Sequence, residues 1–221
     1  MPRTHTQFHW FNPGWRHFDD FLAALTQTKR KKIRAERRKV KDAGITTLVR
    51  TGETLTDADW DFFYRCYANT YHLRGNAPYL TPEFFKAVGK QLPQHCVMAL
   101  AEQHGEPIAA SLLWLDQIDG KQRLYGRYWG TVQHADCLHF ELAYYTPIEW
   151  AINKGIEVIE GGAQGEHKLA RGFVPVVTHS AHWLAHPGFA DAVDRFLEQE
   201  RAGMLSYTQS LNSPFKQEIG D

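Results

Sequence analysis

Three strand-like segments follow one another in the middle of the chain and limit its fold more than any other feature. Residues 96–102, 107–115 and 122–129 are mostly apolar or aromatic, and short polar turns separate them. The second turn contains Asp119-Gly120, a strong β-hairpin signal. The sequence therefore predicts three successive antiparallel strands at the centre of the fold.

Helical periodicity flanks these strands on both sides. Apolar residues spaced by three or four predict one long helix over residues 17–42. Further helices are expected from the aromatic series at residues 60–71, from Thr81-Pro82, over residues 138–154 and from Phe189 to about Ser206. We interpret the aromatic series as core, because aromatic residues at helical spacing usually pack inside.

The remaining segments complete an α+β fold. Residues 156–159 predict a strand that leads into a glycine-rich segment, and residues 174–177 and 180–184 predict two late strands. The tail after Ser210 is expected to be weakly ordered. We expect an N-terminal segment over residues 1–44 and a domain over residues 45–221, together one compact unit around a mainly antiparallel sheet.

Composition excludes several classes of protein. Hydrophobic residues make up 43% of the 221 residues and charged residues 23%, as in ordinary globular proteins. No apolar run reaches the length of a membrane span and the first ten residues lack a signal-peptide core, so a cytoplasmic location is expected. Cys66, Cys96 and Cys137 are too few and too far apart for a disulfide framework or a CxxC metal site, and no metal site is predicted.

The basic residues are concentrated although the net charge is zero. Residues 29–42 hold nine of the 25 lysines and arginines, against only Glu36 and Asp42. A concentrated positive field of this kind attracts phosphates or nucleic acid. The alternative is that these basic residues form a solvated helix face. The candidate phosphate- or tRNA-binding residues are Lys29, Arg30, Lys32, Arg34, Arg37 and Arg38.

The segment over residues 160–173 has the composition of a functional site. Gly162 and Gly165 permit close approach of a ligand, and Gln164, Glu166 and His167 supply polar groups. His167 beside a carboxylate is the best candidate for a proton acceptor. The candidate catalytic residues are Glu166, His167, Lys168 and Glu141, and the candidate substrate-binding residues are His139, Tyr145, Glu160, Gly162, Gln164, Gly165, Arg171 and Gly172. A solvated strand-to-helix turn is the alternative.

His139 and Glu141 are two residues apart on the expected helix over residues 138–154. Their side chains point in different directions, so a shared metal is not expected. Each is a candidate for the wall of a cleft, and capping or packing is the alternative for each. The sequence contains no P-loop, no GxSxG motif and no GxGxxG motif.

Several motifs resemble those of one family. They are Phe8-His9-Trp10, Phe18-Asp19-Asp20-Phe21-Leu22, Lys29-Arg30-Lys31-Lys32-Ile33-Arg34, Leu138-His139-Phe140-Glu141, Gly162-Ala163-Gln164-Gly165-Glu166-His167-Lys168 and Arg171-Gly172-Phe173. Together with the order of elements they resemble the FemAB-like proteins of peptidoglycan biosynthesis or recognition, within the GNAT acyltransferase superfamily. Such proteins are normally longer, and the chain resembles their C-terminal portion.

The resemblance implies a GNAT-like fold and the transfer of an acyl or aminoacyl group to an amine. It implies aminoacyl-tRNA or acyl-CoA as donor, and a peptidoglycan precursor or another amine-bearing small molecule as acceptor. Glu166 or His167 would accept the amine's proton, and Lys168 and Arg171 would stabilise the oxyanion. The segment over residues 130–137 holds one glycine where a GNAT enzyme has its pyrophosphate loop, which disfavours acetyl-CoA. A non-catalytic module that binds peptidoglycan precursors or nucleic acid, and an acetyl-CoA-dependent N-acetyltransferase, are the alternatives.

Overall fold

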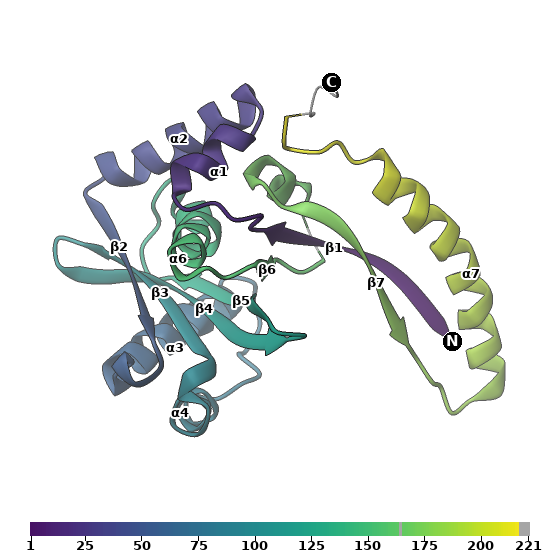
Figure 1. The fold of residues 1–221 in the computed structure, drawn as a ribbon. Coiled ribbons are helices and arrows are strands. Elements are labelled where there is room, and N and C mark those ends of the chain that lie inside the picture. Colours follow the sequence, from purple (N-terminus) through teal and green to yellow (C-terminus); the bar gives the residue numbers. More distant parts are fainter. Residues whose placement is uncertain (164, 217–221) are drawn as a thin grey trace.

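The computed structural model describes residues 1–163 and 165–216, apart from the side chains of Glu53, Glu166, Ala202 and Leu205. Its strands and helices follow one another in the order labelled in Figure 1. They are β1 (Pro2–Phe11), α1 (Phe18–Ala24), α2 (Gln27–Asp42), β2 (Ile45–Thr51), η1 (Gly52–Thr54), α3 (Asp57–His72), α4 (Pro82–Gln91), η2 (Pro93–His95), β3 (Cys96–Gln103), β4 (Glu106–Ile118), β5 (Lys121–Thr131), α5 (Leu138–Phe140), η3 (Glu141–Tyr145), α6 (Thr146–Lys154), β6 (Val158–Glu160), η4 (Glu166–Arg171), β7 (Val174–Ala181) and α7 (Pro187–Ser210).

One sheet of seven strands organises the molecule, in the order β2-β3-β4-β5-β6-β1-β7. The three expected central strands are confirmed as β3, β4 and β5, which pair antiparallel in succession. At the hairpin between β4 and β5, Asp119 and Gly120 have φ values of 52° and 77°. Two successive positive φ values match the tight turn that the Asp-Gly pair predicts. The predicted α+β class with a mainly antiparallel sheet is therefore confirmed.

The strands β5 and β6 form the parallel pair of the sheet, and they soon separate. Their register joins Arg123, Leu124 and Tyr125 to Val158, Ile159 and Glu160. Beyond these pairs β5 continues to Thr131, whereas β6 ends at Glu160. Backbone groups beyond the last pair are not joined across the sheet, so the two strands leave an opening there.

The strand β1 was not expected from the sequence. It lies between β6 and β7, antiparallel to both, so the start of the chain is an inner strand of the sheet. Its inward positions alternate as a strand requires, but two of them are Thr4 and Thr6. Because these buried residues are polar, the period-two pattern of apolar residues is hidden in the sequence.

The long helix predicted over residues 17–42 is wrong, because the chain forms two helices with a break between them. Leu25 has extended dihedral angles and bridges Phe215, and the amide of Thr26 donates to the carbonyl oxygen of Pro214 at 3.1 Å. Residues 211–216, expected to be weakly ordered, supply these contacts. The apolar stripe is continuous, but tertiary contacts replace helical hydrogen bonds at this point.

Helices cover both faces of the central strands (Figure 1). The helices α3 and α4 pack on one face, where Trp60, Phe63 and Tyr67 are buried, as expected for the aromatic series. The helices α1, α2 and α6 lie on the other face and enclose Trp10, Phe21 and other core residues. The site described below lies between these layers, where the sheet opens.

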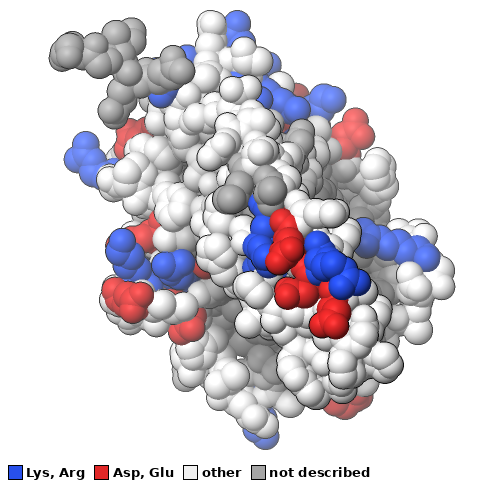
Figure 2. Space-filling model, turned by 90° about the vertical axis from the view of Figure 1, so that its right-hand side faces the viewer, with Lys and Arg blue, Asp and Glu red and all other residues white. Residues whose placement is uncertain are grey.

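The C-terminal elements differ from their expected bounds. A single strand, β7, replaces the two expected late strands, and α7 begins slightly earlier and ends later than predicted. The helix α7 lies along β1 and β7 on the right of Figure 1. Acidic and basic side chains lie close together on this face (Figure 2). Arg3 of β1 pairs with Glu200 of α7 at 2.7 Å. This face therefore carries no field of a single sign.

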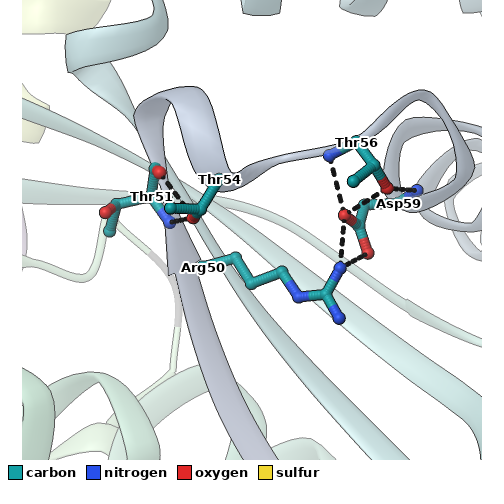
Figure 3. Close-up of polar contacts among 5 residues, drawn as sticks. All are labelled: Arg50, Thr51, Thr54, Thr56 and Asp59. Carbon is teal, nitrogen blue, oxygen red and sulfur yellow. Dashed lines mark hydrogen bonds and ion pairs between the residues drawn. The ribbon is translucent and has the colours of Figure 1, made fainter.

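The start of α3 is fixed to the edge strand β2 by a buried carboxylate. Asp59 accepts hydrogen bonds from the amide and hydroxyl of Thr56 at 2.8 and 2.7 Å, and Arg50 donates to it at 2.7 and 2.8 Å (Figure 3). Thr56 in turn caps the amide of Asp59. The Arg50–Asp59 ion pair thereby fixes the position of α3 relative to β2.

Candidate active site

A pocket of about 160 Å³ lies where β5 and β6 separate. We call it the splay pocket. Its walls come from β5, from β6 and the residue after it, from the helical run over residues 138–144, and from Lys168 in η4 and Phe173 just after η4. Its polar lining includes His139, Tyr144, Glu160 and Lys168. Three of these four residues were candidates from the sequence, and Tyr144 was not.

Lys168 is a buried cation at the wall of this pocket. Its side chain is 6% exposed, and its ammonium donates to the carbonyl oxygen of Gly162 at 3.4 Å and lies 5.9 Å from the ring of Phe8. No carboxylate among the described side chains pairs with it. Burial lowers the pKa of Lys168 to about 8, because the charged form loses its hydration.

Tyr144 connects the pocket to His167. The hydroxyl of Tyr144 lies 3.0 Å from Nε2 of His167, whose ring is exposed outside the pocket. Burial raises the pKa of Tyr144 to about 12. The pKa of His167 is lowered by burial and then by the positive charges of Arg171, Lys168 and Lys32. Both groups are therefore neutral at neutral pH and form a path by which a proton can leave the pocket.

His139 lies beside this pair as a neutral imidazole. Its ring packs 5.1 Å from the ring of Trp129 and 5.7 Å from that of Tyr144, measured between centroids. Burial, and secondarily the charges of His167, Arg171 and Lys168, lower the pKa of His139 to about 4. The ring can accept or donate a hydrogen bond at neutral pH without carrying charge.

The π-helical turn η3 explains why Tyr144 was missed. His139 and Tyr144 are five residues apart, a spacing that an α-helix places on different faces. A π-helix has i to i+5 hydrogen bonds and brings such residues together, and η3 spans Glu141–Tyr145 between them. The sequence shows a continuous helical pattern here, so no signal marked the shift in register.

Glu141 and Tyr145 lie away from the splay pocket. Glu141 is buried and accepts hydrogen bonds from Nε of Arg37 at 3.1 and 3.2 Å and from the hydroxyl of Thr146 at 3.2 Å. Burial raises the pKa of Glu141, against the opposing effect of Arg37. Tyr145 is fully buried and donates to Glu36. The structure therefore separates Glu141 from His139, with which a shared cleft was expected, and gives Tyr145 a packing role.

Arg171 also differs from its expected role, because it does not reach the pocket. Its side chain is 1% exposed, and Nη2 donates to both carboxylate oxygens of Glu36 at 2.8 and 2.9 Å. Nη1 donates to the carbonyl oxygen of His167 at 2.7 Å, and the guanidinium lies 3.4 Å from the centroid of Phe140. Arg171 therefore holds η4 against α2, and its partner Glu36 is a positioning residue that the sequence did not single out.

The glycine-rich segment is shaped by contacts inside the protein. Gly165 has φ 102°, and a Cβ atom there would lie 2.1 Å from the His167 ring. Gly172 has φ 85°, and a Cβ atom there would lie 2.5 Å from Phe21, so this glycine serves packing. Gly162 holds Lys168 through its carbonyl oxygen. Gln164 lies outside the described residues, as does the side chain of Glu166.

The basic helix α2 presents its cations unequally. Lys32, Arg34 and Arg38 are exposed, and Lys29 and Arg30 are half-buried. Arg37 is different, because its guanidinium is paired with Glu141 and with Glu149, the latter at 2.6 Å. The expectation that Arg37 binds phosphate is therefore not supported by its surroundings. For the other five residues, phosphate or tRNA binding stays a prediction.

The described part of the chain limits two other functions. It contains no group of three or more histidine, cysteine, aspartate or glutamate side chains that is placed to hold a metal ion. None of its helices is both long and apolar enough to cross a lipid bilayer.

FemX and L-PGS are among the solved structures that resemble this fold. FemX has 11% sequence identity and a TM-score of 0.54, with 77% of this chain and 59% of FemX covered. L-PGS from Bacillus licheniformis has 12% identity and a TM-score of 0.53, with 76% of this chain and 51% of L-PGS covered. The chain thus spans about half the length of L-PGS. At these identities the likeness shows that the chain shares the fold of these two proteins over the covered part.

The sequence comparisons give the family. No curated protein matches the chain. Residues 1–217 match a protein family described as FemAB-like, peptidoglycan biosynthesis/recognition, which is nearly the whole sequence. Because this match covers nearly the whole sequence, the chain belongs to the FemAB-like family.

Proposed function

We propose that the protein transfers an acyl or aminoacyl group from an activated ester or thioester to an amine, in the splay pocket. The observation that carries the proposal is Lys168, a buried ammonium without a carboxylate partner among the described side chains, placed beside the Tyr144–His167 pair. Membership of the FemAB-like family and the likeness to FemX and L-PGS support it.

The amine nitrogen attacks the carbonyl carbon of the donor, and the nitrogen must lose a proton as the bond forms. Tyr144 lines the pocket, and its hydroxyl takes this proton and passes its own proton to Nε2 of His167. His167 is suited to this role, because burial and nearby cations keep it unprotonated at neutral pH. Glu166 precedes His167 in η4 and is a second candidate proton acceptor.

Lys168 stabilises the negative charge on the carbonyl oxygen of the tetrahedral intermediate. In a buried site a fixed cation acts more strongly than in water, since no solvent must reorganise. When the intermediate collapses, the C–O bond of an ester or the C–S bond of a thioester breaks. The leaving oxygen or sulfur then takes a proton from Lys168 or from solvent.

The donor is an aminoacyl-tRNA or an acyl-CoA, and the exposed cations of α2 favour the nucleic acid. Lys32 lies near enough to His167 to lower its pKa, so the basic face continues to the edge of the site. Phosphates bound along Lys32, Arg34 and Arg38 would place the ester end of a tRNA near the splay pocket. The proposed acceptor is a peptidoglycan precursor or another amine-bearing small molecule.

Transfer by the purified chain tests this proposal. A panel of aminoacyl-tRNAs and acyl-CoA esters is incubated with amine acceptors, and products are identified by mass spectrometry. We expect Lys168→Met to lower the rate by about 100-fold or more, as for the loss of one oxyanion donor. Tyr144→Phe and His167→Gln should each reduce it by about 100-fold, and Glu166→Gln tests the second proton acceptor.

The control is Lys154→Met, which removes an exposed lysine from the end of α6. It should transfer at the rate of the unaltered protein. Full activity of Lys168→Met would contradict the proposal. Binding of donor and acceptor with no transfer would identify the chain as a binding module instead.

A further inference from the structure

A second, larger pocket adjoins the splay pocket on the side of α4. Its volume is about 520 Å³, within the range of pockets that hold small ligands. Gly126, Arg127 and Glu160 line both pockets, so the two meet at these residues. We call the larger one the outer pocket. A molecule that occupies it can extend one end into the splay pocket.

A β-bulge places Arg127 at this junction. On the neighbouring strand Leu112 pairs with Tyr128 and Leu113 pairs with Gly126, so Arg127 is the extra residue of β5. Bulges break the alternation of a strand and redirect a side chain, and they are common beside active sites. The guanidinium of Arg127 lies 5.3 Å from the centroid of Tyr128, which lines the splay pocket.

The charge of Arg127 is not neutralised by the described part of the protein. Its side chain is exposed, and no described carboxylate lies within ion-pair distance of it. Arg123 on the same strand is paired with Glu160 at 3.0 Å. Arg123 is therefore held by an ion pair within the protein, whereas Arg127 can pair with a ligand.

The rest of the outer pocket suits a short carbon chain. An apolar wall is formed by Val88, Leu92 and Trp114. Leu92 is 47% exposed, so its apolar surface is accessible to a ligand. Asp116 also lines the pocket, on β4, where its carboxylate accepts a hydrogen bond from the amide of Gln117. A ligand with an anion at Arg127 can lay its chain on the apolar wall.

We propose that the outer pocket holds the acceptor and that Arg127 binds an anionic group of it, a carboxylate or a phosphate. The acceptor is then an amine that carries an anion, with its nitrogen directed past Glu160 into the splay pocket. Arg127 is suited to both anions, since its planar guanidinium donates two parallel hydrogen bonds. The inference rests on the proposed function for the fate of the amine, and the binding itself does not depend on it.

Matched pairs of small amines test the inference without any donor. 6-Aminohexanoate is compared with 6-aminohexanamide, and 2-aminoethyl phosphate with ethanolamine, by NMR titration of the full chain at pH 7. We expect the unaltered protein to bind at least one member that carries the carboxylate or phosphate roughly 10-fold more tightly than its partner without that group, as a charge-assisted hydrogen bond allows. The pair that shows the larger preference identifies the anion as carboxylate or phosphate.

Two arginine variants make the test specific. Arg127→Gln should abolish the preference, and Arg127→Lys should keep part of it. Arg65→Gln is the matched control, because Arg65 is also exposed and lies 5.2 Å from the centroid of an aromatic ring, that of Phe62 on α3. It should leave the preference unchanged.

Equal binding of the members with and without the anionic group by the unaltered protein would overturn the inference, as would a preference that survives Arg127→Gln. These outcomes are distinct from a failure of the proposed function. A protein that prefers anionic amines through Arg127 but transfers nothing would keep the pocket assignment and lose the transferase.

Discussion

Two cations of η4, Lys168 and Arg171, are both buried, but their surroundings differ. Arg171 has a carboxylate partner in Glu36, a carbonyl partner in His167 and an aromatic ring against its face. Lys168 has one long hydrogen bond, to Gly162, and no described carboxylate partner. A buried charge costs free energy unless it is paired. The contrast indicates that Arg171 stabilises the fold, whereas the charge of Lys168 is left without a described carboxylate partner, as the proposed function requires.

The largest expected effect comes from removing Arg171. The variant Arg171→Met leaves Glu36 buried without its cation, and breaking a buried pair in this way costs about 3 to 5 kcal/mol. We expect the free energy of unfolding, measured by urea denaturation at pH 7, to fall by that amount. The double variant Glu36→Gln/Arg171→Met should recover part of the loss, because it also removes the orphaned charge.

A loss below about 1 kcal/mol in the single variant, the range of surface pairs, would contradict the structural role of Arg171. A normal far-ultraviolet circular dichroism spectrum should accompany the fall in stability. If the single variant is too unstable to purify, the double variant, which is expected to be less destabilised, is compared with the unaltered protein instead.

Lys168 should show the opposite behaviour and a dependence on pH. Its pKa is about 8 in the folded protein and near its ordinary value of 10.5 when unfolded. Below pH 8 the lysine is charged in both states, so burial of the charge lowers the free energy of unfolding by its full amount. Between pH 8 and 10.5 the unfolded chain binds more protons, so stability rises with pH relative to a variant without the lysine.

The measurement is the difference in unfolding free energy between Lys168→Met and the unaltered protein across pH 7 to 10.5. At pH 7 the variant should be the more stable, by up to roughly 3 kcal/mol, and the advantage should disappear by pH 10.5. Because other groups titrate in both proteins, the difference isolates Lys168. A constant difference would show that this ammonium is solvated.

The same contrast shows what the sequence could reveal. Glycines and polar residues over residues 160–173 predicted a site in this segment, and Glu160 and Lys168, which were named from it, line the splay pocket. The sequence could not show which of two nearby cations is paired, because Glu36 lies 135 residues from Arg171 in the chain. Long-range pairing depends on tertiary structure.

The fold was predictable where the spacing of apolar residues and the residue types of the turns indicate the same elements. The strands β3 to β5 follow from local pattern and an Asp-Gly turn, and the aromatic series of α3 is core. The strand β1 was missed because buried threonines interrupt its apolar alternation, and the break at Leu25 because residues 214–216 supply the partner groups. Elements that depend on distant partners leave weak local signals.

Arg37 and Arg38 extend the contrast to neighbouring residues of α2. Arg37 pairs with the buried Glu141, whereas Arg38 is exposed. We expect Arg37→Gln to cost about 2 kcal/mol, because a buried carboxylate loses its cation and keeps only weaker partners. Arg38→Gln should change stability by less than about 0.5 kcal/mol. Urea denaturation of both variants measures the difference, and equal effects would remove the distinction between paired and free cations on this helix.

A smaller effect than for Arg37 is expected where a pair is only partly buried. Arg50 pairs with Asp59 at the start of α3, and its side chain is 36% exposed. Solvent screens such a pair, and Asp59 keeps its hydrogen bonds from Thr56, so Arg50→Met should cost about 1 kcal/mol at pH 7. Burial alone would raise the pKa of Asp59, but the hydrogen bonds from Thr56 and Arg50 outweigh it and lower the pKa.

The lowered pKa of Asp59 sets the direction in which the stabilisation by the Arg50–Asp59 pair changes with pH. A carboxylate with a lowered folded pKa contributes stability that is present above its unfolded pKa, near 4, and is lost as pH falls through the folded value. The cost of Arg50→Met should therefore be full at pH 7 and shrink below about pH 4, opposite in direction to the change expected for Lys168 at alkaline pH. A cost that persists in acid would mean that Arg50 stabilises the protein through packing of its aliphatic chain rather than through its charge.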